Sequence, residues 1–121
     1  MSGRRHHLLL GAHGERLAAA HLRRDGMRVL ARNWRNPQGE LDIVAADRGV
    51  TVFCEVKTRR SLRFGTPMEA IDEAKATQVR RVAAGWWRTR RGRGRSQRFD
   101  AVGVIVRADG TASIDHRRGV L

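Results

Sequence analysis

The sequence predicts an α/β fold in which two helices flank a β-sheet, in the order helix, three-strand meander, helix and one or two final strands. Three observations support this class. Apolar residues recur at helical spacing over residues 8–24 and again over residues 66–89. Between these segments, residues 27–57 contain runs of alternating character that are separated by turn residues. A further strand-like run at 99–106 follows the second helical segment.

The first helix is expected from Leu8 to Arg24, after a basic start at residues 1–7 that lacks periodicity and that we expect to be flexible. Gly26 follows the apolar stripe and is suited to end the helix. Glu15 falls on the same face as the stripe, where acids are uncommon. Helical spacing alone favours a boundary residue whose carboxylate extends to solvent.

The meander is expected to begin with a strand at 27–34, followed by a turn at 36–39 and a second strand from Gly39. Strand side chains alternate between the two faces of a sheet. In the first strand this rule groups Met27, Val29 and Ala31 against Arg28, Leu30, Arg32 and Trp34. In the second strand it groups Glu40, Asp42, Val44 and Ala46 against Leu41, Ile43 and Ala45.

The second and third strands form a predicted hairpin around a turn at 47–49, and its register decides where the acids lie. A two-residue loop, or a four-residue loop, pairs Ala46 with Thr51 and places Asp42 across from Glu55. A three-residue loop would put Asp42 on the wrong face unless a bulge intervened. Two carboxylates at cross-strand distance repel each other, and a divalent cation between them relieves the repulsion.

Lys57 lies on the same face as Glu55, one strand repeat further along, and Cys54 faces the opposite side. Two acids and a lysine around one point are a known arrangement for hydrolysing phosphodiesters. Charges at the end of such an apolar strand rarely occur without partners. We therefore treat Asp42, Glu55 and Lys57 as the candidate catalytic residues, and Cys54 as an inert buried thiol.

The second helical segment is expected from Thr66 to about Thr89, with Asp72 as an alternative N-cap that would break it. The strongly basic, glycine-containing segment 90–98 is either a solvated loop or a phosphate-contacting flap, and we favour the flap. Final strands are expected at 99–106 and 111–116. The residues expected to contact nucleic acid are Arg59, Arg60, Arg63, Lys75, Arg90, Arg91, Arg93 and Arg95.

Composition narrows the class of partner. The 121 residues are expected to form one domain, 1–121, and they carry 25 Lys and Arg against 12 Asp and Glu, a formal charge of +13. Such an excess indicates a polyanionic partner, most often nucleic acid, although ribosomal and membrane-surface proteins share it. No apolar run is long enough to span a membrane, and a single cysteine fits a cytoplasmic setting.

The order of elements, with acids in the second and third strands, resembles the PD-(D/E)xK nuclease superfamily. Its restriction-endonuclease-like core has a mixed sheet flanked by helices. Asp42 stands at the position of that superfamily's metal-binding aspartate, and Glu55-Val56-Lys57 matches its E-x-K motif. A longer pattern resembles the YraN-like family of small bacterial proteins, which are related to Holliday-junction resolvases. It comprises Gly11–Glu15, Gly39–Asp42, Phe53–Lys57, Phe64-Gly65, Lys75 and Arg98–Asp100.

The resemblance implies roles for the site residues. Asp42, Glu55, the carbonyl of Val56 and Glu15 are the implied ligands of Mg²⁺ or Mn²⁺, and Lys57 is the implied catalytic lysine. The resemblance thereby supplies a functional reason for an acid on the packed face of the first helix. For Glu40 the alternatives stay open. It contacts the metal ligands, or it binds a second metal, or it is a solvent-exposed charge at the end of a strand.

The implied activity is endonucleolytic cleavage of structured or branched DNA. The related resolvases work as dimers, so the resemblance also implies a possible homodimer. The alternative is a nucleic-acid-binding protein that keeps the nuclease fold and does not cut. The intact set of Asp42, Glu55 and Lys57 favours the nuclease, because a domain without catalytic function has no need to retain all three.

Overall fold

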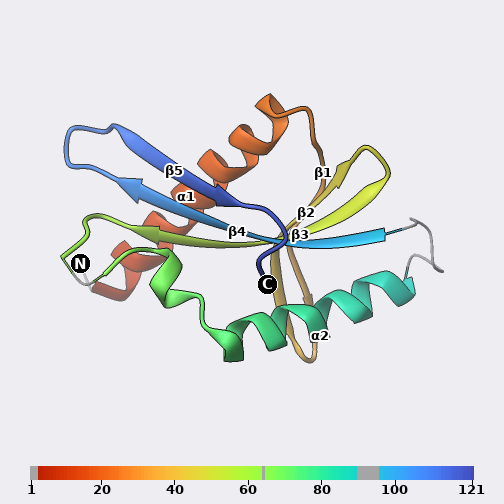
Figure 1. The fold of residues 1–121 in the computed structure, drawn as a ribbon. Helices are drawn as coiled ribbons and strands as arrows, with labels where there is room; N and C mark the ends of the chain where they lie inside the picture. The colour runs from red at the N-terminus through yellow and green to blue at the C-terminus, as the bar shows by residue number, and fades with distance from the viewer. Residues whose placement is uncertain (1–2, 64, 90–95) are drawn as a thin grey trace.

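The computed structural model describes residues 3–63, 65–89 and 96–121. Its five strands form one sheet in the order β1-β2-β3-β4-β5, in which β3 and β4 are parallel and the other neighbours are antiparallel. The helices α1 and α2 lie on opposite faces of the sheet (Figure 1). The elements are α1 (Gly3–Arg24), β1 (Arg28–Asn36), β2 (Gly39–Asp47), β3 (Val50–Arg59), the 3₁₀ helix η1 (Met68–Ala70), α2 (Glu73–Thr89), β4 (Ser96–Val106) and β5 (Ala112–Arg117). The predicted α/β class and the mixed sheet are confirmed, and the architecture is compatible with a restriction-endonuclease-like core.

Two apolar cores hold the helices to the sheet. Leu22 and its neighbours on α1 pack on the face that carries Ile43 and Cys54. On the other face, α2 packs against Phe53. The alternation predicted for β3 is therefore confirmed, because Phe53 and Cys54 enter different cores. Neither helix contains a stretch of the length and hydrophobicity that crossing a bilayer requires, among the residues described.

The helix α1 begins at Gly3, so the expectation of a non-helical start up to His7 is wrong for residues 3–7. Arginine and leucine are good helix formers, and nothing between Gly3 and Leu8 breaks the helix. The predicted end is confirmed. Gly26 has φ of +89°, and the backbone bonds from Gly26 to Arg23 and from Met27 to Leu22 form a Schellman ending.

Strand β1 does not alternate as expected. Its register against β2 shifts between Val29 and Ala31, and Asn33 adopts a left-handed conformation with φ of +53°. As a result Val29 packs on the α1 side, whereas Ala31 and Trp34 both pack on the α2 side. The predicted grouping of Ala31 with Val29, and the separation of Trp34 from Ala31, are therefore wrong because a bulge resets the period of two.

Strand β2 shows a matching irregularity. Ile43 and Ala45 enter the α1 core as expected, but Leu41 enters the α2 core. The register that pairs Trp34 with Leu41 and Arg32 with Ile43 places Asn33 opposite Asp42. Both strands thus depart from regular alternation at the same point, and the predicted grouping of Leu41 with Ile43 is wrong.

The β2–β3 hairpin has the register on which the candidate site depends. Asp47 pairs with Val50 and Ala46 with Thr51, around a two-residue loop of Arg48 and Gly49. Both loop residues have positive φ, at +50° and +87°, as a type I′ turn requires. Of the loop lengths considered, the two-residue loop is the one that forms.

The second half of the chain differs from expectation in its boundaries. The alternative break at Asp72 is confirmed, because its carboxylate accepts the Lys75 N–H at 2.9 Å and α2 starts at Glu73. Strand β3 extends to Arg59, beyond the strand-like run predicted to end at 57, because its pairing with β4 continues there. Strand β4 begins at Ser96. The prediction of a loop or flap up to residue 98 is therefore wrong for residues 96–98. Residues 90–95 of the proposed flap lie outside the described residues.

Candidate metal centre

The candidate site lies where the sheet forks. Strands β2 and β3 pair as far as Ile43 and Cys54, after which β2 continues with β1 while β3 continues with β4. The Val56 N–H donates a hydrogen bond of 2.8 Å to Asp42 Oδ2. The Asp42 side chain thereby takes the place of the next backbone hydrogen bond between these strands. Asp42 is thereby fixed at the opening of the fork.

Glu55 adjoins Asp42 from the neighbouring strand, as the register predicts. It is only 7% exposed, and its carboxyl group shares a hydrogen bond with that of Asp42. Burial, followed by repulsion from Asp42, raises the pKa of Glu55 to about 8, and nearby Lys75 opposes the shift. Lys75 Nζ lies 3.4 Å from Glu55 Oε1, so the fold places this lysine within the acidic group.

Glu15 reaches the same point from α1. The helix passes very close to β3, because a Cβ at Gly14 would overlap the side chain of Thr58. Each of Glu15, Glu40 and Asp42 offers a carboxylate oxygen, and these oxygens lie within 4.8 Å of one another. Burial and repulsion from Asp42 raise the pKa of Glu15 to about 7.

Asn33 also belongs to the site, and sequence reasoning missed it. With its amide oriented to satisfy its neighbours, the nitrogen lies 2.9 Å from Glu40 Oε1 and 2.9 Å from Glu15 Oε1. Its left-handed backbone is tolerated by asparagine better than by most residues. An asparagine within a run of alternating polar residues gives only a weak indication of such a role.

A cleft of about 540 Å³ opens beside the acids, between the β1–β2 turn and α2. The turn packs tightly on the helix, since a Cβ at Gly39 would lie 2.9 Å from Gln78 Nε2. The Arg35 guanidinium pairs with Glu40 at 2.9 Å on the rim. The cleft is lined by Arg35, Asn36, Gln38, Asp42, Lys75 and Gln78, among others.

The donor set suits a hard divalent cation. Burial raises the pKa of Asp42, and the Val56 N–H and the charge of Lys75 act against that shift. Burial is the largest cause of all three raised pKa values, and repulsion from Asp42 adds to the shifts of Glu15 and Glu55. Carboxylate oxygens are the ligands that Mg²⁺ and Mn²⁺ prefer, so the converging oxygens of Glu15, Glu40 and Asp42 fit such an ion, with Glu55 hydrogen-bonded to Asp42 beside them.

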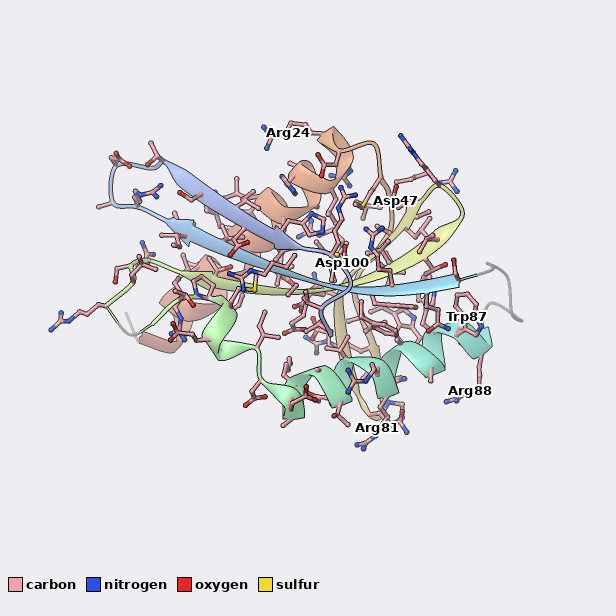
Figure 2. The ribbon with its side chains drawn as sticks, viewed as in Figure 1. Arg24, Asp47, Arg81, Trp87, Arg88 and Asp100 are labelled. Carbon is pink, nitrogen blue, oxygen red and sulfur yellow. The ribbon has the colours of Figure 1, made fainter. Side chains whose placement is uncertain are left out.

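The remaining predicted residues are not among the side chains that meet at this centre or line its cleft, within the part of the chain that the structure describes. Lys57 is exposed on β3, two residues beyond Glu55. Arg60 and Arg63 are exposed after β3, and Arg59 is half-buried within it. Arg81 and Arg88, which were not predicted, project from the outer side of α2 (Figure 2). Arg90, Arg91, Arg93 and Arg95 lie outside the described residues.

Comparisons with known proteins connect this chain to one family. A sequence model of the family described as "Uncharacterised protein family UPF0102" matches residues 14–104. A UPF0102 protein of Nocardioides sp. is 49% identical over 92% of this chain and 90% of its own length. A UPF0102 protein of Nocardia farcinica is 49% identical over 92% of this chain and 87% of its own length. A UPF0102 protein of Rhodococcus opacus is 43% identical over 93% of this chain and 96% of its own length. The matched residues include Glu15, Asp42, Glu55 and Lys57.

Proposed function

The chain belongs to the UPF0102 family, and we propose that it is a divalent-metal-dependent endonuclease that hydrolyses phosphodiesters in structured or branched DNA. The membership agrees with the resemblance to YraN-like proteins. The activity is our inference from the site. The observation that carries it is the convergence of Glu15, Glu40 and Asp42 at the fork beside a cleft, with Glu55 hydrogen-bonded to Asp42.

Glu15, Asp42 and Glu55 would hold Mg²⁺ or Mn²⁺, with the Val56 carbonyl as a further ligand. When bound, such an ion supplies positive charge that polarises a phosphate and lowers the pKa of a coordinated water. Asn33 orients Glu15 and Glu40 through its amide, and the Val56 N–H orients Asp42. The chain thereby holds the ligands in place before any ion enters, which reduces the cost of ordering them.

Lys57 is the chain's own candidate for charge stabilisation during the reaction. It lies beyond Glu55 on the same strand and is exposed, so its ammonium group is free to meet a phosphate oxygen or a nucleophilic water. Lys75 has a different role, because it already contacts Glu55. Its positive charge limits the repulsion between Glu55 and Asp42 in the metal-free protein.

The basic surface would hold the nucleic acid. The chain carries a formal charge of +13, and exposed arginines occur after β3 and along α2. Lys and Arg contacts to phosphates release counterions, so binding should weaken steeply as salt is raised. This contribution is independent of the acids, which allows binding and cleavage to be measured separately.

The test is cleavage of labelled linear, flapped and four-way DNA by purified protein with Mg²⁺, Mn²⁺ or EDTA. Cleavage is expected with either metal and not with EDTA. Asp42→Asn should reduce the rate by about 1,000-fold while leaving DNA affinity intact or slightly higher. Lys57→Ala should reduce turnover with little effect on metal affinity.

Asp115→Asn is the matched control, because Asp115 is an exposed acid that pairs with Arg117 on β5. It should cut at the wild-type rate. If the wild-type protein binds branched DNA but cuts none of the substrates with either metal, and Asp42→Asn behaves identically, the endonuclease is rejected. The chain would then be a nucleic-acid-binding protein with a nuclease-like fold.

A further inference from the structure

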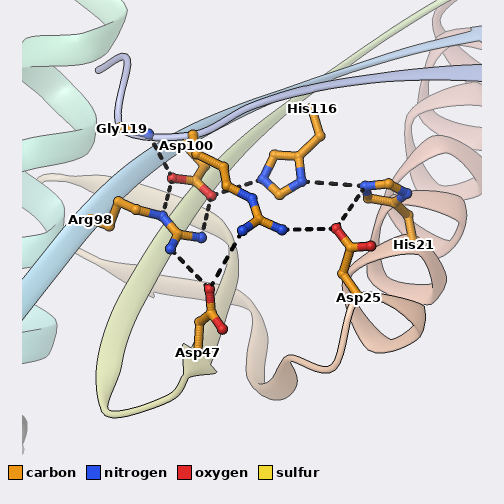
Figure 3. Close-up of polar contacts among 8 residues, drawn as sticks. His21, Asp25, Asp47, Arg98, Asp100, His116 and Gly119 are labelled. Carbon is orange, nitrogen blue, oxygen red and sulfur yellow. Dashed lines mark hydrogen bonds and ion pairs between the residues drawn. The ribbon is translucent and has the colours of Figure 1, made fainter.

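A second cluster of metal-ligating side chains lies where the end of α1 meets β5 (Figure 3). His21 is on α1, Asp25 follows that helix, and His116 is on β5. One ligand atom from each lies within 4.8 Å of the others. The acidic centre at the fork uses none of these residues, so this cluster needs its own explanation.

The orientation of His116 is fixed from behind. Its Nε2 lies 2.8 Å from Asp100 Oδ2, and the Asp100 side chain is fully buried. Because the carboxylate accepts a hydrogen bond from the Nε2–H, the neutral ring presents an unprotonated Nδ1 on its other side. A carboxylate behind a histidine ring in this way is the usual support of a zinc-bound histidine.

The side of the His116 ring that carries Nδ1 faces His21. His116 Nδ1 and His21 Nε2 are 3.3 Å apart, and the rings meet edge to face. Two nitrogens bound to one tetrahedral zinc ion at about 2.0–2.1 Å would be separated by about 3.3 Å. Asp25 Oδ2 lies 3.7 Å from His21 Nε2, so a carboxylate oxygen is available on the same side.

Solvent can reach this cluster. The His21 and Asp25 side chains are 26% and 39% exposed, whereas His116 is 6% exposed and forms the inner wall. One competing cation is present, because Arg118 Nη2 contacts Asp25 Oδ2 at 3.0 Å. The oxygen that Arg118 contacts is the same Oδ2 that lies nearest to His21, so a metal bound there shares Oδ2 with Arg118 or displaces the guanidinium.

We propose that His21 Nε2, His116 Nδ1 and Asp25 form a site for a zinc-like divalent transition metal, with a fourth position open to water. The two imidazoles select such an ion over Mg²⁺, which prefers oxygen ligands. The bound ion would link α1 to β5 and stabilise the folded chain. This site is separate from the acidic centre and does not depend on nuclease activity.

The test uses a variant in which His6, His7 and His13 are replaced by Gln, so that His21 and His116 are the only histidines left. With ¹⁵N-labelled histidine, the imidazole nitrogen signals then report this site alone, whatever the acidic centre binds. Addition of Zn²⁺ should shift the signals of His116 Nδ1 and His21 Nε2 and raise the melting temperature. In the metal-free protein, His116 should be the tautomer protonated on Nε2.

His21→Phe is the decisive variant, because it removes one ligand and leaves the contact between His116 and Asp100 in place. This variant should bind Zn²⁺ about 100-fold or more weakly, as measured from the imidazole nitrogen signals of His116. Arg118→Gln should bind Zn²⁺ at least as tightly, since it removes the cation that competes for Asp25. The proposal is overturned if excess Zn²⁺ leaves both imidazoles unchanged, or if His21→Phe binds as tightly as its parent.

Discussion

The acidic centre at the fork and the network around Asp100 are both built on buried carboxylates, yet their electrostatics are opposite. At the fork, Glu15 of α1 and Glu55 of β3 each lie close to Asp42 of β2, and the pKa values of Glu15 and Glu55 are raised to about 7 and 8. Burial also acts to raise the pKa of Asp100, but hydrogen bonds from His116, Arg98 and the Gly119 N–H hold that pKa at about 2.

The difference arises from partners and not from depth. Asp100 accepts two bonds from Arg98, at 2.9 and 3.0 Å, and one from the Gly119 N–H at 3.0 Å, besides its contact with His116. Arg98 also pairs with Asp47 at 2.9 Å, which connects β4 to the end of β2. The Asp100 network is therefore complete and joins several elements. Among the described residues, the carboxylate oxygens at the fork accept fewer hydrogen bonds than those of Asp100. Such oxygens can still bind a cation.

The largest expected effect of this difference is on stability. Asp100→Asn would deprive Arg98 and His116 of their buried anionic partner and should lower the free energy of unfolding by about 3 kcal/mol or more. Asp42→Asn, measured without metal, should leave stability unchanged or increase it, because it removes one of several repelling charges. Urea unfolding followed by tryptophan fluorescence measures both variants, with Asp115→Asn as the exposed control. Equal losses in the two variants would make the fork acids structural and remove the distinction.

A smaller effect is expected from pH. Glu15 and Glu55 have folded-state pKa values raised above the ordinary value of 4.5. Their contribution to stability is therefore complete below about pH 4.5 and is lost as pH rises through about 7 to 8. Asp100 has the opposite sign, since its stabilisation is present above its ordinary value of 3.8 and is lost as pH falls towards about 2.

In EDTA, the free energy of unfolding should accordingly fall by about 1–2 kcal/mol between about pH 5 and pH 9, allowing for solvent screening of half-buried Glu15. Mg²⁺ should reduce or reverse this fall, because it binds the deprotonated acids of the folded state. Asp42→Asn should also reduce it, since the Asp42 charge contributes to both raised pKa values. A flat profile in EDTA would contradict the view that the fork acids repel one another.

The smallest expected effect concerns Asn33 and distinguishes backbone strain from ligand positioning. Asn33→Ala and Asn33→Gly both remove the amide that contacts Glu15 and Glu40, so both should weaken Mg²⁺ binding by about tenfold. Only alanine is strained at φ of +53°, so it should be about 1 kcal/mol less stable than the glycine variant. Calorimetric titration and urea unfolding provide the two measurements. Unchanged Mg²⁺ affinity in both variants would show that the amide does not position the acids.

Much of the fold was predictable because local patterns decide it. Gly26 ends α1 and Asp72 caps α2, each through a backbone preference that acts over a few residues. The Arg48-Gly49 turn selects the hairpin register, and that register brings Asp42 to Glu55. The strongest features of the candidate site therefore follow from a turn and a strand alternation that can be read along the chain.

The irregular part of the site was not predictable in this way. A period of two assumes regular strands, and it fails where Asn33 and Asp42 oppose each other and send Trp34 and Leu41 to the α2 side. Chain boundaries also shifted where pairing continued, as for Arg59 in β3 and Arg98 in β4. These positions depend on neighbouring strands, whose influence a single run of residues does not record.

The α/β class, the register of the acids and the excess of positive charge follow from short-range periodicity, turn chemistry and composition. Which buried acids repel each other and which are paired depends on how distant segments pack. Asp100 meets His116, and His116 meets His21, a residue 95 positions away in the chain. Such contacts form because α1 and β5 pack near the same end of β4, and the pKa of a buried group depends on the charges that packing brings to it.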